Sequence, residues 1–373
     1  MILPEFFEAP PCVYAVGNEY QIIVPVFQEC LMWVRVGTEE YYDDSNGILR
    51  SASHTHKMIV PMAELDKAKE YTVCFRIVGQ RLPYFSKTGQ VEEFSFPFRP
   101  VEQVYSRPLH VYMISDTHSR INAPVECGKY FGDKLDLLLL NGDIPDHSGD
   151  VKNFVAFHKI AGHITNGSLP VVFARGNHDL RGICAELLAD HTPTQNGRSY
   201  YTFRLGYIWG IVMDCGEDKE DSHEAYGNTN CCHAFRRRET KFLEEVIRNA
   251  KDEYEADGVT LKLVLCHVPF SDISVPPFDI EKDLYKYWCT LLRENVKPDL
   301  MLCGHKHNCY VSHKGSSYDK QGQPCTVVVG GKPGKSYWEQ YETALEITGK
   351  EAHVMYTDQE HKILSEETFS IPE

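Results

Sequence analysis

The sequence predicts an α/β (α+β) protein in which a β-sandwich domain, residues 1–104, precedes an α/β domain, residues 105–373, with one mixed sheet or two stacked sheets. Three observations lead to this prediction. Short segments in which apolar and polar residues alternate, separated by turn signals, fill the first hundred residues and predict strands. After residue 109, apolar runs alternate with helical periods, and a chain of 373 residues is long enough for two domains.

The first part has the pattern of an immunoglobulin-like or fibronectin III-like sandwich. Residues 71–77 and 94–98 alternate apolar and polar side chains, and shorter apolar segments lie at 22–24, 32–36 and 58–60. Several short strands in about a hundred residues are typical of such a sandwich, and Tyr71 at a strand start suggests its tyrosine corner.

The second part contains five near-continuous apolar runs, which indicate strands that are buried on both faces. The runs are residues 109–115, 135–140, 171–174, 261–266 and 300–303. Helical periods lie between them, for example around Leu243 and Trp288. Residues 200–205 and 207–214 flank Gly206 and predict a hairpin, and three further strands are expected near the C-terminus, at 325–329, 344–347 and 352–356.

The chain is acidic along its whole length. It has 53 Asp and Glu and 38 Lys and Arg, and acids exceed bases in residues 1–104 (14 against 9) and in 105–373 (39 against 29). This argues against a broad basic face for nucleic acid and against docking on an anionic membrane. The longest apolar run, 207–213, is far shorter than the roughly 20 residues of a membrane helix. Acids stand where a secretory signal has bases, so we expect a cytoplasmic protein.

Thirteen cysteines are a high and odd number. Several lie inside apolar runs, among them Cys74, Cys266 and Cys303. This placement predicts buried, reduced thiols and not a disulfide framework.

A polar cluster follows each of the five apolar runs. The clusters are Asp116-Thr117-His118, Gly142-Asp143, Gly176-Asn177-His178-Asp179, His267 and Gly304-His305-Lys306-His307. Because ligands of open α/β sheets bind outside the carboxyl ends of the strands, five strands would bring these side chains to one rim. Carboxylate, imidazole and amide oxygen without thiolate are donors that suit a pair of first-row transition metals.

Two alternatives compete with a two-metal site. Polar residues follow strands in any α/β protein, which accounts for the polarity but not for the repeated choice of ligand types. A structural zinc site could use Cys303, His305, His307 and Cys309. Structural zinc prefers spaced pairs such as C-x2-C, however, and the sequence contains none.

In this order the clusters resemble the motifs of the calcineurin-like metallophosphoesterases. The matching motifs are D-x-H at 116–118, G-D at 142–143, G-N-H-D at 176–179, His267 and G-H-x-H at 304–307. The resemblance implies an αββα sandwich with two stacked mixed sheets. A sandwich ahead of this domain resembles the layout of purple acid phosphatases. Their motif is G-D-x-x-Y, and this chain has Asp146 at the position of the tyrosine. No ferric tyrosinate is therefore expected, and an Asp at this position resembles the Ser/Thr protein phosphatases.

The resemblance also implies roles for individual residues. The implied ligands are Asp116, His118 and His307 for one divalent metal, Asn177, His267 and His305 for the other, and Asp143 as the bridge. His178 would be the general acid, with Asp146 behind it. Mn, Fe or Zn would be the ions, since nitrogen and oxygen donors fit all three.

Two further residues are candidates for substrate binding. Arg181 lies two residues after G-N-H-D and suits phosphate oxygens, although a surface arginine is the alternative. The polar insertion at 215–236 leaves a strand end, so His223, with Asp221 and Tyr226, either shapes substrate choice or belongs to a solvated loop.

The resemblance implies a dinuclear metal-dependent phosphoesterase that hydrolyses a phosphomonoester or phosphodiester by direct attack of a metal-bridging hydroxide. A small phosphoester is the expected substrate, because the acidic chain has no nucleic-acid footprint. The alternative is a non-enzymatic interaction module that retains the fold. Such a module is expected to lack some ligands, whereas every ligand position and His178 are filled here.

Overall fold

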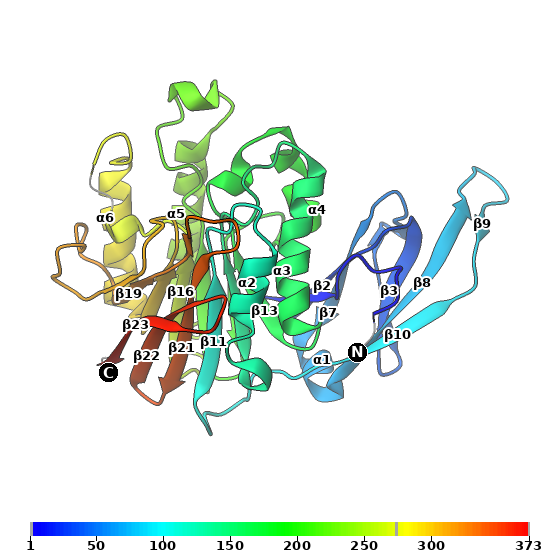
Figure 1. The fold of residues 1–373 in the computed structure, drawn as a ribbon, viewed down its shortest axis with the longest axis horizontal. Coiled ribbons are helices and arrows are strands. Elements are labelled where there is room, and N and C mark those ends of the chain that lie inside the picture. The colour runs from blue at the N-terminus through cyan, green and yellow to red at the C-terminus, as the bar shows by residue number, and fades with distance from the viewer. Residues whose placement is uncertain (1–2, 273–274, 372–373) are drawn as a thin grey trace.

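The computed structural model describes residues 3–272 and 275–371 (Figure 1). It confirms the predicted fold class, because an N-terminal β-sheet region precedes an α/β sandwich with two mixed sheets. Among the described residues, no helix combines the length and the apolar character that crossing a membrane requires.

The largest sheet contains ten strands and joins both ends of the chain. Its order is β23 (Ile363–Ser370), β22 (Glu351–Asp358), β21 (Gln340–Thr348), β11 (Leu109–Ile114), β12 (Leu137–Asn141), β13 (Pro170–Ala174), β1 (Cys12–Val16), β2 (Glu19–Pro25) and β7 (Thr55–Pro61), with β20 (Lys332–Pro333) beside β21. Strands β11, β12 and β13 are parallel, so their carboxyl ends share one edge.

A six-stranded sheet forms the other half of the α/β sandwich. Its order is β14 (Tyr201–Leu205), β15 (Ile208–Met213), β16 (Leu261–Cys266), β17 (Leu300–Cys303), β19 (Thr326–Val329) and β18 (Tyr310–Ser312). β14 and β15 form the predicted hairpin, and β15, β16, β17 and β19 are parallel. Helix α5 (Cys232–Arg248) connects β15 to β16, and α6 (Lys282–Leu291) connects β16 to β17, because parallel neighbours need a crossover connection.

Helices cover the outer faces of these two sheets, which completes the αββα order (Figure 1). The ten-stranded sheet packs against α2 (Asn122–Gly128) and α3 (Val155–Thr165), and the six-stranded sheet packs against α5 (Cys232–Arg248) and α6 (Lys282–Leu291). The short helix α4 (Leu188–His191) lies near β7, and a π-helical turn (Leu292–Val296) continues α6. A third hydrophobic cluster fills the space between the sheets.

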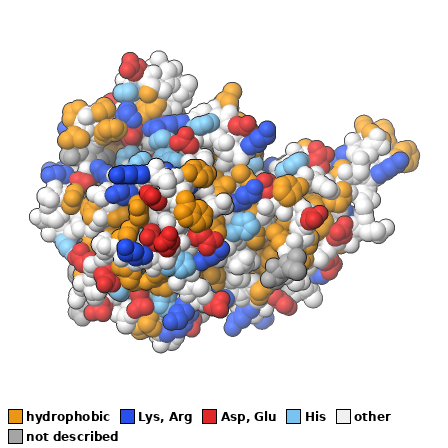
Figure 2. Space-filling model, in the orientation of Figure 1, with side chains coloured by type: hydrophobic (Ala, Val, Ile, Leu, Met, Phe, Trp, Pro, Cys, Tyr) orange, Lys and Arg blue, Asp and Glu red, His pale blue; other side chains and the backbone are white. Residues whose placement is uncertain are grey.

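The N-terminal region adds a sheet of β10 (Glu92–Pro97), β8 (Glu70–Gln80), β3 (Cys30–Val36) and β4 (Glu39–Tyr42), with β9 (Lys87–Thr88) beside β8. A two-stranded ribbon, β5 (Asp44–Ser45) and β6 (Ile48–Leu49), and helix α1 (Met62–Ala68) lie between these strands in the chain. The hairpin of β8 and β9 projects from the molecule, and apolar side chains including Tyr84 and Phe85 are exposed at its tip (Figures 1 and 2).

The two predicted units share a sheet. Strands β1, β2 and β7 come from residues 1–104, yet β1 pairs in parallel with β13 of the second unit. Tyr71 also links the two units, because its hydroxyl donates a hydrogen bond to the backbone carbonyl of Gly167 in the second unit (2.8 Å). The tyrosine-corner interpretation is therefore wrong, because that motif bonds to the backbone of its own sandwich.

The cysteines lie where the apolar pattern places them. All thirteen are unpaired in the structure, and ten of them are buried. Burial raises the pKa of Cys30 and Cys289 to about 12, so these thiols stay protonated at neutral pH.

Candidate metal centre

The seven predicted ligands meet at one rim, where the carboxyl ends of the two α/β sheets come together. Asp116 and His118 follow β11, Asp143 follows β12, and Asn177 follows β13. The six-stranded sheet supplies His267 after β16 and His305 and His307 after β17. Asp116, Asp143, Asn177 and His267 are each at most 2% exposed.

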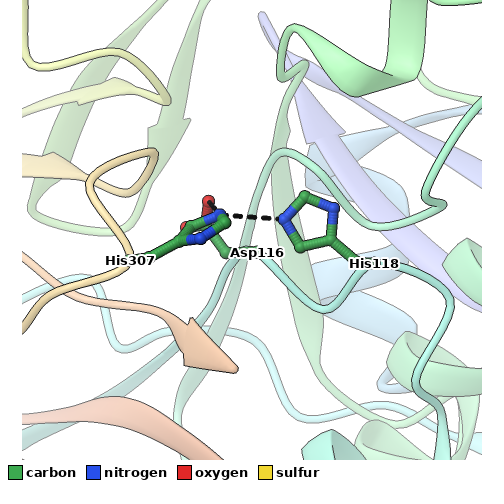
Figure 3. Close-up of side chains that lie close together, drawn as sticks. All are labelled: Asp116, His118 and His307. Atoms are coloured by element: carbon green, nitrogen blue, oxygen red, sulfur yellow. Dashed lines mark hydrogen bonds and ion pairs between the residues drawn. The ribbon is translucent and has the colours of Figure 1, made fainter. Parts of the chain in front are cut away.

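The first cluster contains Asp116, His118 and His307, whose ligand atoms all lie within 4.8 Å of one another (Figure 3). Nε2 of His307 lies 3.4 Å from Oδ1 of Asp116 and 2.9 Å from Nε2 of His118. Two imidazole nitrogens and one carboxylate oxygen thus point into the same small space, which suits a divalent cation.

The second cluster contains Asp143, His267 and His305, again within 4.8 Å. Nδ1 of His267 donates to the carbonyl of Asn141 (2.6 Å), so Nε2 faces the cluster. That Nε2 is buried and faces two carboxylates, with Oδ2 of Asp143 at 3.2 Å and Oδ1 of Asp116 at 3.9 Å. Metal-binding histidines typically donate their other ring N–H to a carbonyl or carboxylate, as His267 does to Asn141. A buried ring nitrogen that faces two carboxylates in this way fits a metal.

Asn177 and Asp143 connect to this second cluster. Oδ1 of Asn177 lies 3.0 Å from Nδ1 of His305. Asp143 accepts a hydrogen bond from the backbone N–H of His178 through Oδ1 (2.7 Å), while Oδ2 lies 3.2 Å from Nε2 of His267. Nε2 of His267 is also 3.9 Å from Oδ1 of Asp116, so the clusters adjoin. His/Asp clusters arranged in this way are consistent with a dinuclear site.

The electrostatics of the metal-free cluster centre on one protonated imidazole. Burial alone would lower the pKa of His267, but Asp143 and Asp116 outweigh it and raise that pKa to about 10. Burial likewise would raise the pKa of Asp143, and His267 beside it holds that pKa well below its usual range. For His305, burial and then the charge of His267 lower the pKa to about 4. A bound cation would replace the proton on His267.

The backbone is strained where it presents the ligands. Positive φ angles occur at Asp116 (54°), His118 (44°), Asp143 (53°), His305 (69°) and His307 (47°). Residues with a Cβ rarely adopt this left-handed region, and such strain clusters at functional sites.

Gly142, directly before Asp143, lies where two ligand loops come close together. Its φ is +79°, and a Cβ placed there would lie 2.6 Å from the backbone nitrogen of Gly176 and 2.7 Å from Cγ of His267. The absence of a side chain allows the loops after β12 and β13 and the ring of His267 to approach one another.

His178 lies at this site, but its partners differ from those expected. Its Nδ1 lies 2.8 Å from the backbone carbonyl of Asp146, whereas the Asp146 carboxylate is 3.9 Å away. That carboxylate is closer to Nδ1 of His118 (3.4 Å). The Asp146 backbone therefore orients His178, and the Asp146 side chain lies beside a candidate ligand histidine, as carboxylates commonly do at metal sites.

Arg181 is not a free cation. Its Nε and Nη2 donate to the two carboxylate oxygens of Glu217 (3.0 Å each), and its Nη1 lies 2.7 Å from Nε2 of His178. Asp218 adds a second carboxylate at 3.6 Å. The structure thus places Arg181 beside the candidate acid, with its guanidinium already engaged.

His223 does not lie with these residues. It precedes the short helix η5 (Glu224–Tyr226), where its Nδ1 accepts from the backbone N–H of Ala225 (3.2 Å), and it is absent from the described lining of the cavity beside the ligands. The other insertion candidates support the loop: Asp221 accepts from the N–H groups of Cys232 and His233 at the start of α5, and the Tyr226 hydroxyl donates to Glu217 and Asp218.

Sequence reasoning missed three acids at this site. Glu217 and Asp218 lie in the insertion 215–236, so its position at a strand end was the available signal. Asp179 is the last residue of G-N-H-D. It is fully buried and accepts from the backbone N–H groups of Gly176 (2.8 Å) and Ile144 (3.2 Å), which ties two ligand loops together.

The structural zinc alternative finds no support in the described residues. Cys303 is fully buried in β17, and none of the three candidate metal clusters there contains a cysteine. The third of these clusters combines His118, Asp146 and His178 and overlaps the first.

A cavity of about 410 Å³ opens beside the ligands. Asp143, Asn177, His305 and His307 line it together with His178 and Arg181. A volume of this size lies within the range of small-ligand pockets.

Comparison with known proteins places this site in a family. The family model of the calcineurin-like phosphoesterases matches residues 109–309, more than half of the chain. No curated protein matches the chain by sequence. Among solved structures, a purple acid phosphatase, PPD1, from yellow lupin (Lupinus luteus) is similar with a TM-score of 0.60 and 13% identity over 97% of this chain and 74% of that one. A structure of PhoD is similar with a TM-score of 0.59 and 10% identity over 99% of this chain and 90% of that one.

Both structures include the N-terminal β-sheet region in the match, because the similarity extends over nearly the whole chain. At these identities the likeness concerns the fold. The family match and the ordered ligand clusters together lead to one conclusion: the chain belongs to the calcineurin-like phosphoesterase family, whose members are usually metal-dependent hydrolases.

Proposed function

We propose that this protein is a dinuclear metal-dependent phosphoesterase. The observation that carries the proposal is that two adjoining His/Asp clusters lie beside a cavity that His178 lines. A non-enzymatic interaction module that only retained the fold would not need these ligand clusters and His178 beside one cavity.

The residues divide into two ligand sets that share a carboxylate. Asp116, His118 and His307 would hold one ion, and His267, His305 and Asn177 the other, with Asp143 between them. When bound, two divalent ions supply Lewis-acid activation of water and neutralise charge on phosphoryl oxygens.

The attacking group comes from solvent and not from the chain. The described residues that line the cavity include no serine, threonine or cysteine. The Asp143 carboxylate is occupied by the His178 N–H and faces His267, and Asp218 is paired with Lys219 (2.6 Å). We therefore propose hydrolysis without a covalent enzyme intermediate, in which His305 and His307 of the lining would be metal ligands and His178 the acid.

His178 is placed to transfer a proton to the leaving oxygen. Its Nδ1–H donates to the Asp146 carbonyl, which directs Nε2 toward Arg181 and the cavity. Arginine has no acceptor, so Nε2 of His178 accepts from Arg181 in this arrangement. To act as an acid, Nε2 must take a proton while Arg181 turns toward a phosphate oxygen.

The test is hydrolysis of chromogenic esters by the full chain after removal and controlled replacement of metals. The chelated protein is loaded separately with Mn, Fe, Co, Ni or Zn and assayed with p-nitrophenyl phosphate and bis(p-nitrophenyl) phosphate. We expect hydrolysis with at least one ion, about two bound ions per chain, and strong loss of both in His267→Ala.

His353→Asn is the matched control. His353 lies on β22 and pairs with Glu366 of β23 (2.8 Å), away from the ligand clusters. The control variant should keep both activity and metal content. A well-folded protein that hydrolyses neither ester with any of the five ions would overturn the proposal.

A further inference from the structure

The cavity beside the ligands has an apolar wall in addition to its polar one. Val268, Ile280 and Tyr285 form the buried part of this wall, and Val275 and Phe278 form the exposed part. Tyr285 lies on α6, and the other four residues lie in the segment between β16 and α6. The apolar wall therefore belongs to the same connection that begins at His267.

Val275 and Phe278 remain accessible at this wall, with exposed fractions of 61% and 38%. Large apolar side chains that stay accessible beside a polar rim mark a surface that gains free energy when it is covered. An apolar group on the substrate would cover both.

The lysine and arginine side chains that line the cavity are already paired with acidic side chains. Three lysine or arginine side chains line it among the described residues, and each has an acidic partner: Arg181 with Glu217 (3.0 Å), Lys219 with Asp218 (2.6 Å) and Lys306 with Asp272 (3.5 Å). A second anionic group on a substrate would find no free cation among these residues and would face Asp218.

From these two walls we infer that the substrate carries one phosphoryl group esterified to an apolar, ring-sized group, which packs on Val275 and Phe278. The inference rests on the proposed phosphoesterase function and specifies its substrate class. The size agrees, because a benzene-sized cavity needs about 150 Å³. The cavity of about 410 Å³ accommodates such a ring together with a phosphoryl group.

The experiment compares two inhibitors of the same phosphonate charge that differ only in their apolar group. The metal-loaded full chain hydrolyses p-nitrophenyl phosphate in the presence of methylphosphonate or phenylphosphonate, and each inhibition constant is measured. We expect the inhibition constant of methylphosphonate to exceed that of phenylphosphonate by about tenfold or more, a typical gain from an apolar contact. Phe278→Ser and Val275→Ser should reduce this ratio of inhibition constants at least threefold.

Tyr287→Ser is the control on α6. Tyr287 is 43% exposed and bonds to Glu244 (3.1 Å), and it does not line the cavity, so this variant should keep the ratio. A second arm measures inhibition by phenylphosphonate and 4-carboxyphenylphosphonate. The added carboxylate should weaken inhibition, because no free cation among the described lining residues receives it.

The outcomes separate the inference from the function. Hydrolysis of neither p-nitrophenyl phosphate nor bis(p-nitrophenyl) phosphate would refute the phosphoesterase proposal itself. Hydrolysis with equal inhibition by methylphosphonate and phenylphosphonate, or with a ratio of inhibition constants unaffected by Phe278→Ser and Val275→Ser, would overturn only the substrate class. Tighter binding of the carboxylated phosphonate would do the same.

Discussion

Replacing Gly142 by alanine tests whether the ligand loops approach as closely as the structure shows. The new Cβ would lie 2.6 Å from the backbone nitrogen of Gly176, 2.7 Å from its Cα and 2.7 Å from Cγ of His267. The φ of +79° adds a conformational cost. The left-handed backbone costs about 1–2 kcal/mol, and overpacking of a filled interior costs about 1–3 kcal/mol. Gly142→Ala should therefore lower the free energy of unfolding by about 2–5 kcal/mol.

Gly349→Ala separates the two costs. Gly349 lies in the turn between β21 and β22 with φ of +60°, and a Cβ there would meet nothing within 4 Å. Only the backbone cost of about 1–2 kcal/mol applies to it. Guanidinium denaturation of the metal-free proteins measures both values, and metal analysis follows the loaded ones.

We expect Gly142→Ala to lose metal as well as stability, because the clash displaces the ring of His267. Gly349→Ala should keep its full metal content. If Gly142→Ala were no less stable than Gly349→Ala and bound as much metal, the close packing of the loops after β12 and β13 would be refuted.

Three further predictions concern the acid, its neighbour and pH. His178→Ala should slow esters with poor leaving groups far more than those with good ones, and equal losses would argue against proton donation. Glu217→Gln should release Arg181, lower KM for phosphoesters and reduce stability by about 1.5–3 kcal/mol; an unchanged KM would show that Arg181 does not reach the substrate. In metal-free protein, the pKa of His267 rises from 6.5 to about 10, so its contribution to stability is complete below pH 6.5 and is lost as pH rises through 10. That contribution is at most about 5 kcal/mol, and an unfolding free energy that is independent of pH between 7 and 10 would contradict it.

The strands that carry the ligands were predictable because local signals suffice for them. Residues 261–266 and 300–303, for example, are β16 and β17 with the predicted bounds. These strands are buried on both faces, so their apolar runs are continuous and end abruptly at His267 and Gly304. The ligand positions follow from the strand ends.

Other features depend on contacts that no local pattern encodes. β23 was missed because every residue of Ile363–Ser370 is at least partly exposed, which leaves no buried face to detect. Arg181 was placed near His178 by its spacing, whereas its pairing with Glu217 depends on a loop 36 residues further along the chain.

The pairing of β1 with β13 determines how this protein can be divided. β13 leads directly into the loop with Asn177 and His178, and it is an interior strand only because β1 lies beside it. A fragment that began at residue 105 would lack β1, β2 and β7 and would present β13 as an open edge, the kind of surface that pairs with other chains and aggregates. The N-terminal region is thus not a detachable module: β1 pairs with β2 close by in the chain, but its other neighbour, β13, follows about 150 residues later, and moving the phosphoesterase-family half into another chain requires β1 as well.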